Sequence, residues 1–437
     1  MRALDVFIDG QRVGQLAERD TLWLWSYDPA WAARPDAFDL SPALPRTRAT
    51  HPDGATSRPV QWYFDNLLPE EQLRDLIERE AGIAGHDAFA LLTYLGAESA
   101  GALTLLPAGQ PEPAGHGVRP LPDAALSDRI RALPRTSLTQ AALKRMSLAG
   151  AQHKLLVVYD PGQDRLSEPA GGTPSTHLLK PDHPDRQAYP HSVANEYFAM
   201  SLAARVGLQV PAVWRRYVPQ PVYLVERFDR ARTHDGRVLR RHIIDACQLL
   251  NRSYQFKYRA GLDDLQQVIA LCRQKLATRQ RLWRWLVFNA LVGNHDNHLK
   301  NLSFTVSSQG IDLAPHYDLL STAAYHTQAI AGEAANWPYP PLAIALGGAT
   351  SFHTLTRASL LEAGGALGLT RPQLERELAA LVERVPRHAR ELLAQIEEVN
   401  TRLPGAPPET LGGELRLLRT IVHVVIDQMA AKLNAGA

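Results

Sequence analysis

Residues 291–301, LVGNHDNHLKN, combine residue types and a spacing that suit phosphate chemistry. Asp296 and Asn301 form the pattern D-x-x-x-x-N, which is the spacing of a protein-kinase catalytic loop. In such a loop the carboxylate accepts the proton of an attacking hydroxyl, and the amide oxygen binds a metal ion that bridges the phosphates of ATP. Chance often supplies this pattern, and the plain alternative is that both residues cap helix ends.

A second carboxylate, Asp318, follows 17 residues beyond Asn301 in the run PHYDLLS. Two apolar runs, 302–306 and 311–314, lie between these residues and predict a hairpin that brings Asp318 back to the loop. Asp318 would then bind the same metal ion from its far side. We therefore expect Asp296, Asn301 and Asp318 to converge on one nucleotide-bound divalent ion in a cleft between two lobes.

The composition is that of a globular protein. The length of 437 residues predicts two or three domains, because it exceeds what a single hydrophobic core usually holds. A net charge of +2 gives no case for a strongly basic nucleic-acid binder. Two cysteines, Cys247 and Cys272, make neither a disulfide framework nor a zinc site. No apolar run approaches the roughly 18 residues of a membrane span, and the N-terminus lacks the apolar block of a signal peptide. These features predict a cytoplasmic protein with no membrane partner.

The elements that must position the loop fall into three ranges. Residues 1–108 alternate like strands around Asp9-Gly10, a hairpin signal, and include helical patterns. Residues 109–250 begin with a proline- and glycine-rich linker and continue with strands and one amphipathic helix. Residues 251–437 are mostly helical, and the strongly apolar run 279–292 predicts a core helix that delivers the catalytic loop.

Two features of the middle range suit phosphate binding. The small-residue run SLAGAQHK, residues 147–154, precedes a strand, and such a turn lets backbone N–H groups approach phosphates. It has a single glycine, Gly150, so an ordinary tight turn is an open alternative. Lys180 ends a strand in THLLK, where its charge would neutralise phosphates. The alternative interpretation of Lys180 is a solvated lysine at a strand end.

A third feature is the run ERFDR that follows the apolar residues 222–225. In a nucleotide-binding kinase the segment that joins the lobes offers backbone groups to adenine, and apolar side chains cover the ring. The stretch Glu226 to Phe228 suits that place. A surface salt bridge beside a core phenylalanine remains the alternative.

In this order the runs resemble the HipA family of bacterial toxin serine/threonine kinases. The matching runs span nearly the whole chain: SYDPAW, DNLLPE, GALTLLP, MSLAGAQHK, STHLLKPD, NEYFAMSLAARVGL, VERFDR, GNHDNHLKN and YDLLS. The resemblance implies an α+β, two-lobed protein-kinase-like fold, with an N-terminal α/β module at 1–108, a small nucleotide-binding lobe at 109–250 and a mostly helical catalytic lobe at 251–437.

The resemblance also implies residue roles. Asp296 matches the catalytic base, Asn301 and Asp318 match the Mg²⁺ ligands, and Ser147 matches a serine whose autophosphorylation expels the phosphate loop and silences the enzyme. The positions that match ATP-binding residues are Ala149, Gly150, Ala151, Gln152, Lys180, Glu226, Arg227, Phe228, Gln248, His298 and Lys300.

The family's targets are aminoacyl-tRNA synthetases, notably the glutamyl enzyme. Its members are neutralised by a helix-turn-helix antitoxin of the HipB type, which binds operator DNA. The chain departs from the family at His153, where an acidic residue is common, and this puts the charge of the phosphate loop in doubt.

Two alternatives come from other classes of protein. The chain could act as a non-catalytic scaffold that binds an antitoxin and DNA as a co-repressor. It could instead be a metal hydrolase with a cluster made from His295, Asp296, His298 and His316, because imidazoles and a carboxylate can bind zinc or manganese.

Overall fold

A computed structural model describes residues 1–83, 86–113, 115–144, 146–147, 149–403 and 405–435. The chain forms two compact units that interleave along the sequence. The first contains Met1–Lys180, Leu224–Phe256 and Ser303–Ala314, and the second contains Pro181–Tyr223, Lys257–Leu302 and Pro315–Ala437. The segments expected to bind phosphate and the catalytic loop therefore belong to different units.

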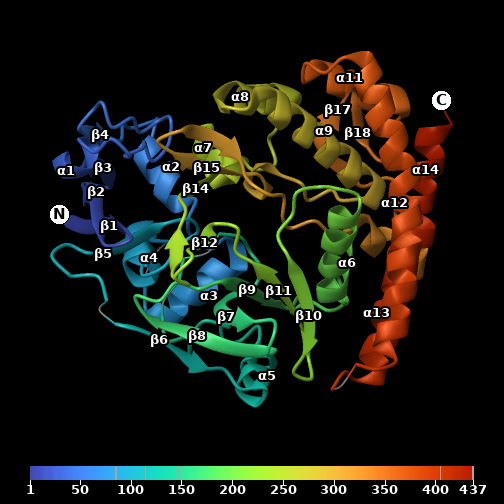
Figure 1. The fold of residues 1–437 in the computed structure, drawn as a ribbon, viewed down its shortest axis with the longest axis horizontal. Helices are drawn as coiled ribbons and strands as arrows, with labels where there is room; N and C mark the ends of the chain where they lie inside the picture. The colour runs from blue at the N-terminus through green and yellow to red at the C-terminus, as the bar shows by residue number, and fades with distance from the viewer. Residues whose placement is uncertain (84–85, 114, 145, 148, 404, 436–437) are drawn as a thin grey trace. The chain divides into compact units, whose positions relative to one another are not determined.

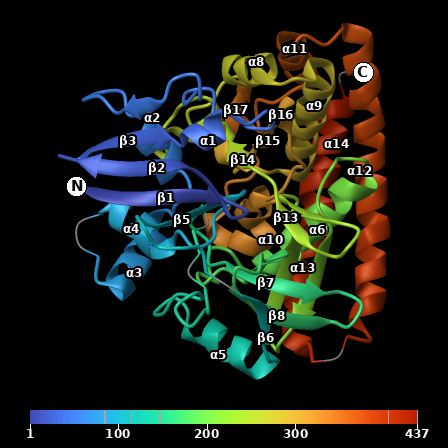
Figure 2. The same ribbon diagram turned by 60° about the vertical axis from the view of Figure 1, so that its left-hand side comes forward.

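The first unit begins with an antiparallel sheet in the order β4-β3-β2-β1-β5. Its strands are β1(Arg2–Ile8), β2(Gln11–Arg19), β3(Leu22–Tyr27), β4(Thr50–Pro52) and β5(Leu103–Pro107), and Figure 2 shows β1, β2 and β3 side by side. The predicted hairpin at Asp9-Gly10 is confirmed, and both residues have the positive φ, 44° and 84°, that suits a tight two-residue turn. The helices of this module are α1(Pro29–Ala32), α2(Pro59–Asp65), α3(Glu71–Ala81) and α4(Ala88–Leu95), of which α1, α2 and α4 contact the sheet.

Aromatic side chains form the core of this module. Trp25 on β3 lies fully buried with its ring 5.6 Å from that of Phe64 on α2, and Phe89 on α4 packs edge-to-face on Trp23. Trp23 and Trp25 are two residues apart on β3, so the alternation of a strand places both rings on the buried face of the sheet.

The rest of the first unit holds the segments expected to bind phosphate. Strands β9, β7, β8 and β6 are neighbours in that order, and β14, β15 and β16 form a separate sheet. The bounds are β6(His116–Pro120), α5(Asp123–Ala132), β7(Leu155–Asp160), β8(Arg165–Gly171), β9(His177–Pro181), β12(Arg230–Arg232), β13(Val238–Arg240), β14(Ile243–Asp245), α7(Ala246–Leu249), η1(Tyr254–Phe256), β15(Ser303–Ser307) and β16(Gly310–Leu313). β15 and β16 pair antiparallel, with Ser307 opposite Gly310, so the hairpin predicted between Asn301 and Asp318 is confirmed.

The second unit is mostly helical. Its elements are α6(Ser192–Arg205), β10(Val213–Tyr217), α8(Leu262–Leu271), α9(Lys275–Val292), η2(Leu299–Asn301), η3(Thr322–His326), α10(Gln328–Ala331), η4(Gly332–Ala334), β17(Pro341–Leu346), β18(Ala349–Ser351), α11(Arg357–Ala366), α12(Arg371–Asn400), α13(Pro408–Thr420), the π-helical turn η5(Ile421–Ile426) and α14(Asp427–Asn434), while β11(Pro221–Glu226) continues into the first unit. Figure 1 shows α12 and α14 side by side, and the two helices are in contact. In the described part of the chain, no helix is long and apolar enough to cross a membrane.

Helix α9 is the core helix that the sequence predicted. Trp283, Trp285 and Phe288 on it are almost fully buried. The helix packs against α12 and α14 and ends one residue before Gly293. The large apolar surface of α9 fixes this helix in the second unit, and the predicted catalytic loop follows directly from its C-terminal end.

Candidate active site

The predicted catalytic loop starts at a position that requires glycine. Gly293 has a φ of 67°, in the left-handed region that favours glycine. A Cβ there would lie 2.6 Å from atoms of Ala323 and Val425. The chain can therefore turn off α9 only because this residue has no side chain, which fixes the direction in which the loop leaves the helix.

Asparagine amides hold the loop in shape. Asn294 donates to the Asn289 side chain at 2.8 Å and accepts from the backbone N–H of Asp296 at 3.0 Å. Asn301 donates from its amide nitrogen to the backbone oxygen of Asp296 at 2.8 Å. This bond links the two ends of D-x-x-x-x-N and leaves the Asn301 amide oxygen as the end that can bind a metal ion.

The Asp296 side chain is 39% exposed, so a substrate can reach it. The Tyr258 hydroxyl donates to its Oδ1 at 2.5 Å, and His298 Nε2 lies 3.9 Å from the same oxygen. Burial raises the pKa of the Asp296 carboxyl above its ordinary value, His298 and Tyr258 oppose that rise, and the charge of Asp318 adds to it. The two carboxylates are therefore close enough to interact electrostatically.

Asp318 itself has an unusual backbone, with a φ of 57°. Aspartate and asparagine tolerate the left-handed region better than most residues, and strained positions of this kind gather at functional sites. The buried Tyr223 hydroxyl has a pKa well above its ordinary value, first because of burial and then because of the charges of Glu196 and Asp318. Asp318 therefore lies in an acidic environment within the second unit, where a cation would be favoured.

His298 and Lys300 are buried within the second unit. His298 packs edge-to-face on Tyr258 with ring centroids 4.8 Å apart, and the backbone oxygen of Lys300 accepts from the Tyr317 hydroxyl at 2.7 Å. The second contact ties the loop to the residue before Asp318.

The histidine cluster of the hydrolase alternative does not form. Among the described residues, one group of three His, Cys, Asp or Glu side chains brings its ligand atoms together, and it does not include His295, Asp296, His298 or His316. His316 stacks on Trp285, while His295 faces His326 with ring centroids 5.2 Å apart.

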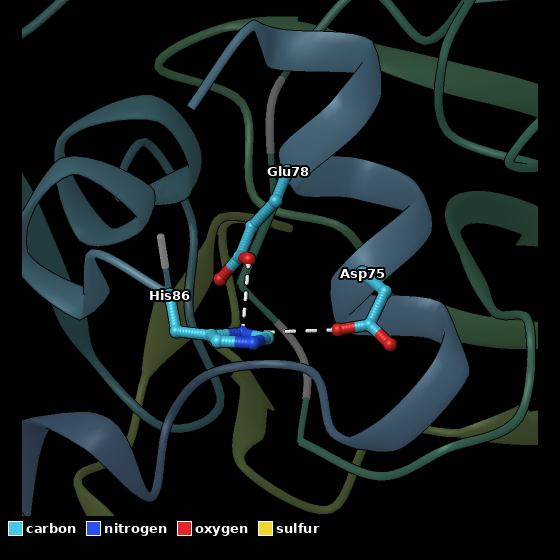
Figure 3. Close-up of side chains that lie close together, drawn as sticks. All are labelled: Asp75, Glu78 and His86. Atoms are coloured by element: carbon cyan, nitrogen blue, oxygen red, sulfur yellow. Dashed lines mark ion pairs between the residues drawn. The ribbon is translucent and has the colours of Figure 1, made fainter. Parts of the chain in front are cut away.

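The one group that does form is Asp75, Glu78 and His86 (Figure 3). His86 Nδ1 lies 3.3 Å from Glu78 and 3.8 Å from Asp75. Glu78 also pairs with Arg74 at 3.1 Å, and Arg74 pairs with Asp65. The group is accounted for as a chain of ion pairs on and after α3, and its exposed members carry no case for a bound metal.

The predicted phosphate loop is held in the first unit by Ser147 and Gly150. Ser147 is fully buried, its N–H donates to the Glu98 backbone oxygen, and its hydroxyl donates to the Leu67 backbone oxygen, each at 2.7 Å. Leu148 lies outside the described residues. Gly150 has a φ of 105°, and its backbone oxygen accepts from Glu70. The positive φ explains why a glycine stands at position 150.

Lys154 is a residue that sequence reasoning did not single out. Its Nζ donates to the backbone oxygen of Ala149 at 2.8 Å and would lie 2.8 Å from a Cβ on Gly150. A second cation thus sits against the loop that contains Ala151 and Gln152. Its signal in the sequence was a lysine directly before the strand β7.

Lys180, at the end of β9, is 4% exposed, which excludes the alternative of a solvated lysine. Glu226 is exposed and Phe228 half-buried. The structure gives other partners to two residues that were predicted to bind ATP. The Arg227 guanidinium bonds to Asp229 and Glu98 in the interior. The Gln248 amide accepts from the backbone of Asp245 and donates to that of Tyr63, so it caps α7.

Arg227 belongs to a buried charge network centred on Glu98. The Glu98 carboxylate pairs with Lys144 at 3.1 Å, Arg227 at 3.3 Å and Arg230 at 3.0 Å. Burial alone would raise the pKa of Glu98, but these three cations hold it well below its ordinary value. The network links Glu98, which follows α4, to Lys144, which precedes Ser147.

Glu98→Gln is expected to lower the free energy of unfolding by about 3–5 kcal/mol, because it removes the carboxylate that pairs with three buried cations, of which Arg227 and Arg230 still pair with Asp229. Urea unfolding followed by circular dichroism measures this. The matched control is Asp235→Asn, which removes an exposed pair with Arg237 and should leave the midpoint almost unchanged. Equal midpoints for the two variants would contradict the prediction.

Comparison with known proteins shows that the chain is a protein kinase. Residues 146–391 match the HipA-like C-terminal domain, and residues 4–106 match the HipA N-terminal domain. The chain is 32% identical over 347 residues to the serine/threonine-protein kinase toxin HipA of Shewanella oneidensis, covering 74% of this chain and 76% of that one. It is 38% identical over 341 residues to the Y4mE protein of Sinorhizobium fredii, covering 74% and 78%.

Among solved structures, HipA in a complex with HipB and operator DNA from Shewanella oneidensis superposes with a TM-score of 0.75 at 26% identity, covering 98% of this chain and 99% of that one. The chain belongs to the HipA family of serine/threonine kinases. The α+β kinase-like fold and the kinase activity predicted from the sequence are thereby confirmed.

Proposed function

We propose that this kinase transfers the γ-phosphate of ATP to a serine of an aminoacyl-tRNA synthetase, with the glutamyl enzyme favoured, and so inhibits translation. The observation that carries the chemistry is the half-exposed Asp296 in a loop closed by the Asn301 amide. Asp296 accepts the proton of the serine hydroxyl as the oxygen attacks phosphorus.

The residues present fit a magnesium ion. Mg²⁺ prefers oxygen ligands, and Asn301 and Asp318 supply an amide oxygen and a carboxylate. The acidic environment of Asp318 favours a cation. When bound, the ion offsets the charge of the phosphates. Lys180 and the small-residue run at 149–152 contact the phosphates, with Lys154 as an additional cation.

The stretch Glu226 to Phe228 contacts adenine through its backbone and the Phe228 ring. For Arg227 and Gln248 we propose supporting roles instead, because their side chains bond within the first unit. Ser147 is the proposed site of autophosphorylation.

We propose a HipB-like helix-turn-helix antitoxin as the partner, with operator DNA bound mainly through that antitoxin. The support is the likeness, over almost the whole chain, to a HipA solved together with HipB and operator DNA. The co-repressor role and the kinase role are compatible in one protein.

Phosphoproteomics of cells that express the protein, compared with cells that express Asp296→Asn, tests the proposed target. The expected result is phosphoserine on an aminoacyl-tRNA synthetase and on Ser147 in the first culture alone. New phosphosites confined to other proteins would overturn the synthetase assignment and leave the kinase assignment in place. Identical phosphosites in both cultures would overturn the role of Asp296.

A further inference from the structure

Tyr258 lies outside every motif of the sequence yet contacts the proposed base. It precedes Asp296 by 38 residues, and its hydroxyl donates to the Asp296 Oδ1 at 2.5 Å. The residue as a whole is 52% exposed. Tyr258 is therefore half open to solvent while its hydroxyl is bonded to the proposed base.

Several contacts fix Tyr258 against the catalytic loop, and all lie within the second unit. The backbone oxygen of Lys257 accepts from the N–H of Leu299 at 3.2 Å. The Tyr258 ring packs edge-to-face on His298, and the Lys257 ammonium lies 5.3 Å from the ring centroid. These contacts hold the ring from the backbone and from two side chains, so the hydroxyl is presented to Asp296 in a defined direction.

A general base must direct one oxygen at the proton it receives, but a carboxylate can rotate about its last bond. A hydrogen bond to one oxygen restricts that rotation and determines where the other oxygen points. We propose that Tyr258 is a positioning residue for phosphate transfer, whose hydroxyl holds Asp296 Oδ1 so that Oδ2 faces the serine hydroxyl of the substrate. This inference rests on the proposed role of Asp296 as the base.

The transfer of the phosphoryl group to serine does not require the proton of the Tyr258 hydroxyl. The serine proton moves to Asp296 Oδ2, the serine oxygen forms a bond to the γ-phosphorus, and the bond from that phosphorus to the oxygen of the ADP leaving group breaks. Tyr258 keeps its proton throughout and acts only through the orientation of Asp296.

Tyr258→Phe tests this role because it removes the hydroxyl and retains the ring that packs on His298. The initial rate of label transfer from γ-labelled ATP to the proteins of a heat-inactivated cell extract gives an apparent kcat, and varying ATP gives its KM. We expect the apparent kcat to fall about tenfold, the size of effect that follows from losing one hydrogen bond to a charged group. The KM for ATP and the thermal unfolding midpoint should stay unchanged.

The matched control is Tyr339→Phe, which removes the hydroxyl of another exposed tyrosine of the second unit and should leave all three quantities unchanged. An unchanged kcat in Tyr258→Phe would overturn the inference. A fall in kcat together with a raised KM or a lower unfolding midpoint would also overturn it, because the bond would then be structural. Asp296→Asn in the same assay separates the two proposals: full label transfer in that variant would reject Asp296 as the base, whereas an inactive Asp296→Asn beside a fully active Tyr258→Phe would reject only the role of Tyr258.

Discussion

Asp296→Asn is expected to lower the rate of phosphate transfer on the order of 10²–10⁴-fold, the contribution of a positioned general base. The amide has nearly the shape of the carboxylate but cannot take a proton at neutral pH. The backbone contacts of Asp296 to Asn294 and Asn301 do not involve the replaced oxygen, so the loop should keep its shape. The rate of label transfer from γ-labelled ATP measures the change.

The control for this variant is binding of ATP in the presence of Mg²⁺, measured by calorimetry, which should be preserved. Retained phosphate transfer in Asp296→Asn would show that another group accepts the proton. Loss of ATP binding would show instead that Asp296 belongs to the nucleotide site.

Asp318→Asn is expected to lower phosphate transfer on the order of 10²–10³-fold, the effect of removing one charged group that stabilises the transition state. Asparagine is the appropriate replacement because it tolerates the φ of 57° at this position, whereas alanine would add backbone strain. The loss should therefore reflect charge alone.

The distinguishing measurement for Asp318→Asn is the dependence of ATP affinity on Mg²⁺. In the unaltered protein the affinity should rise with Mg²⁺, and in the variant that rise should be weaker. An unaltered dependence on Mg²⁺ would contradict the assignment of Asp318 as a ligand.

The sequence predicted those features that depend on local spacing. The D-x-x-x-x-N pattern, the hairpin before Asp318 and the core helix that leads into the loop all rest on periodicity or on neighbours along the chain. The structure contains that helix and that hairpin, and it links Asp296 to Asn301 by a hydrogen bond.

The features that sequence reasoning missed depend on partners far along the chain. Tyr258 contacts Asp296 across 38 residues of sequence, and Arg227 contacts Glu98 across 129 residues. No short sequence pattern can therefore identify either pair. The role of Gln248 had a readable signal, because Asp245 three residues earlier completes a capping box at the start of α7. That signal favoured a structural amide over a nucleotide contact.

The burial of Ser147 would limit the rate at which this residue can be phosphorylated. Because its hydroxyl points at the Leu67 carbonyl and has no exposed surface, any phosphorylation of Ser147 must wait until this segment undocks. The modification rate then follows the undocked population, which falls tenfold for each additional ~1.4 kcal/mol of docking free energy. With Ser147 as the proposed site of autophosphorylation, substitutions around Leu67 and Glu98 that weaken this docking are expected to raise the rate of its modification without changing residues 291–301.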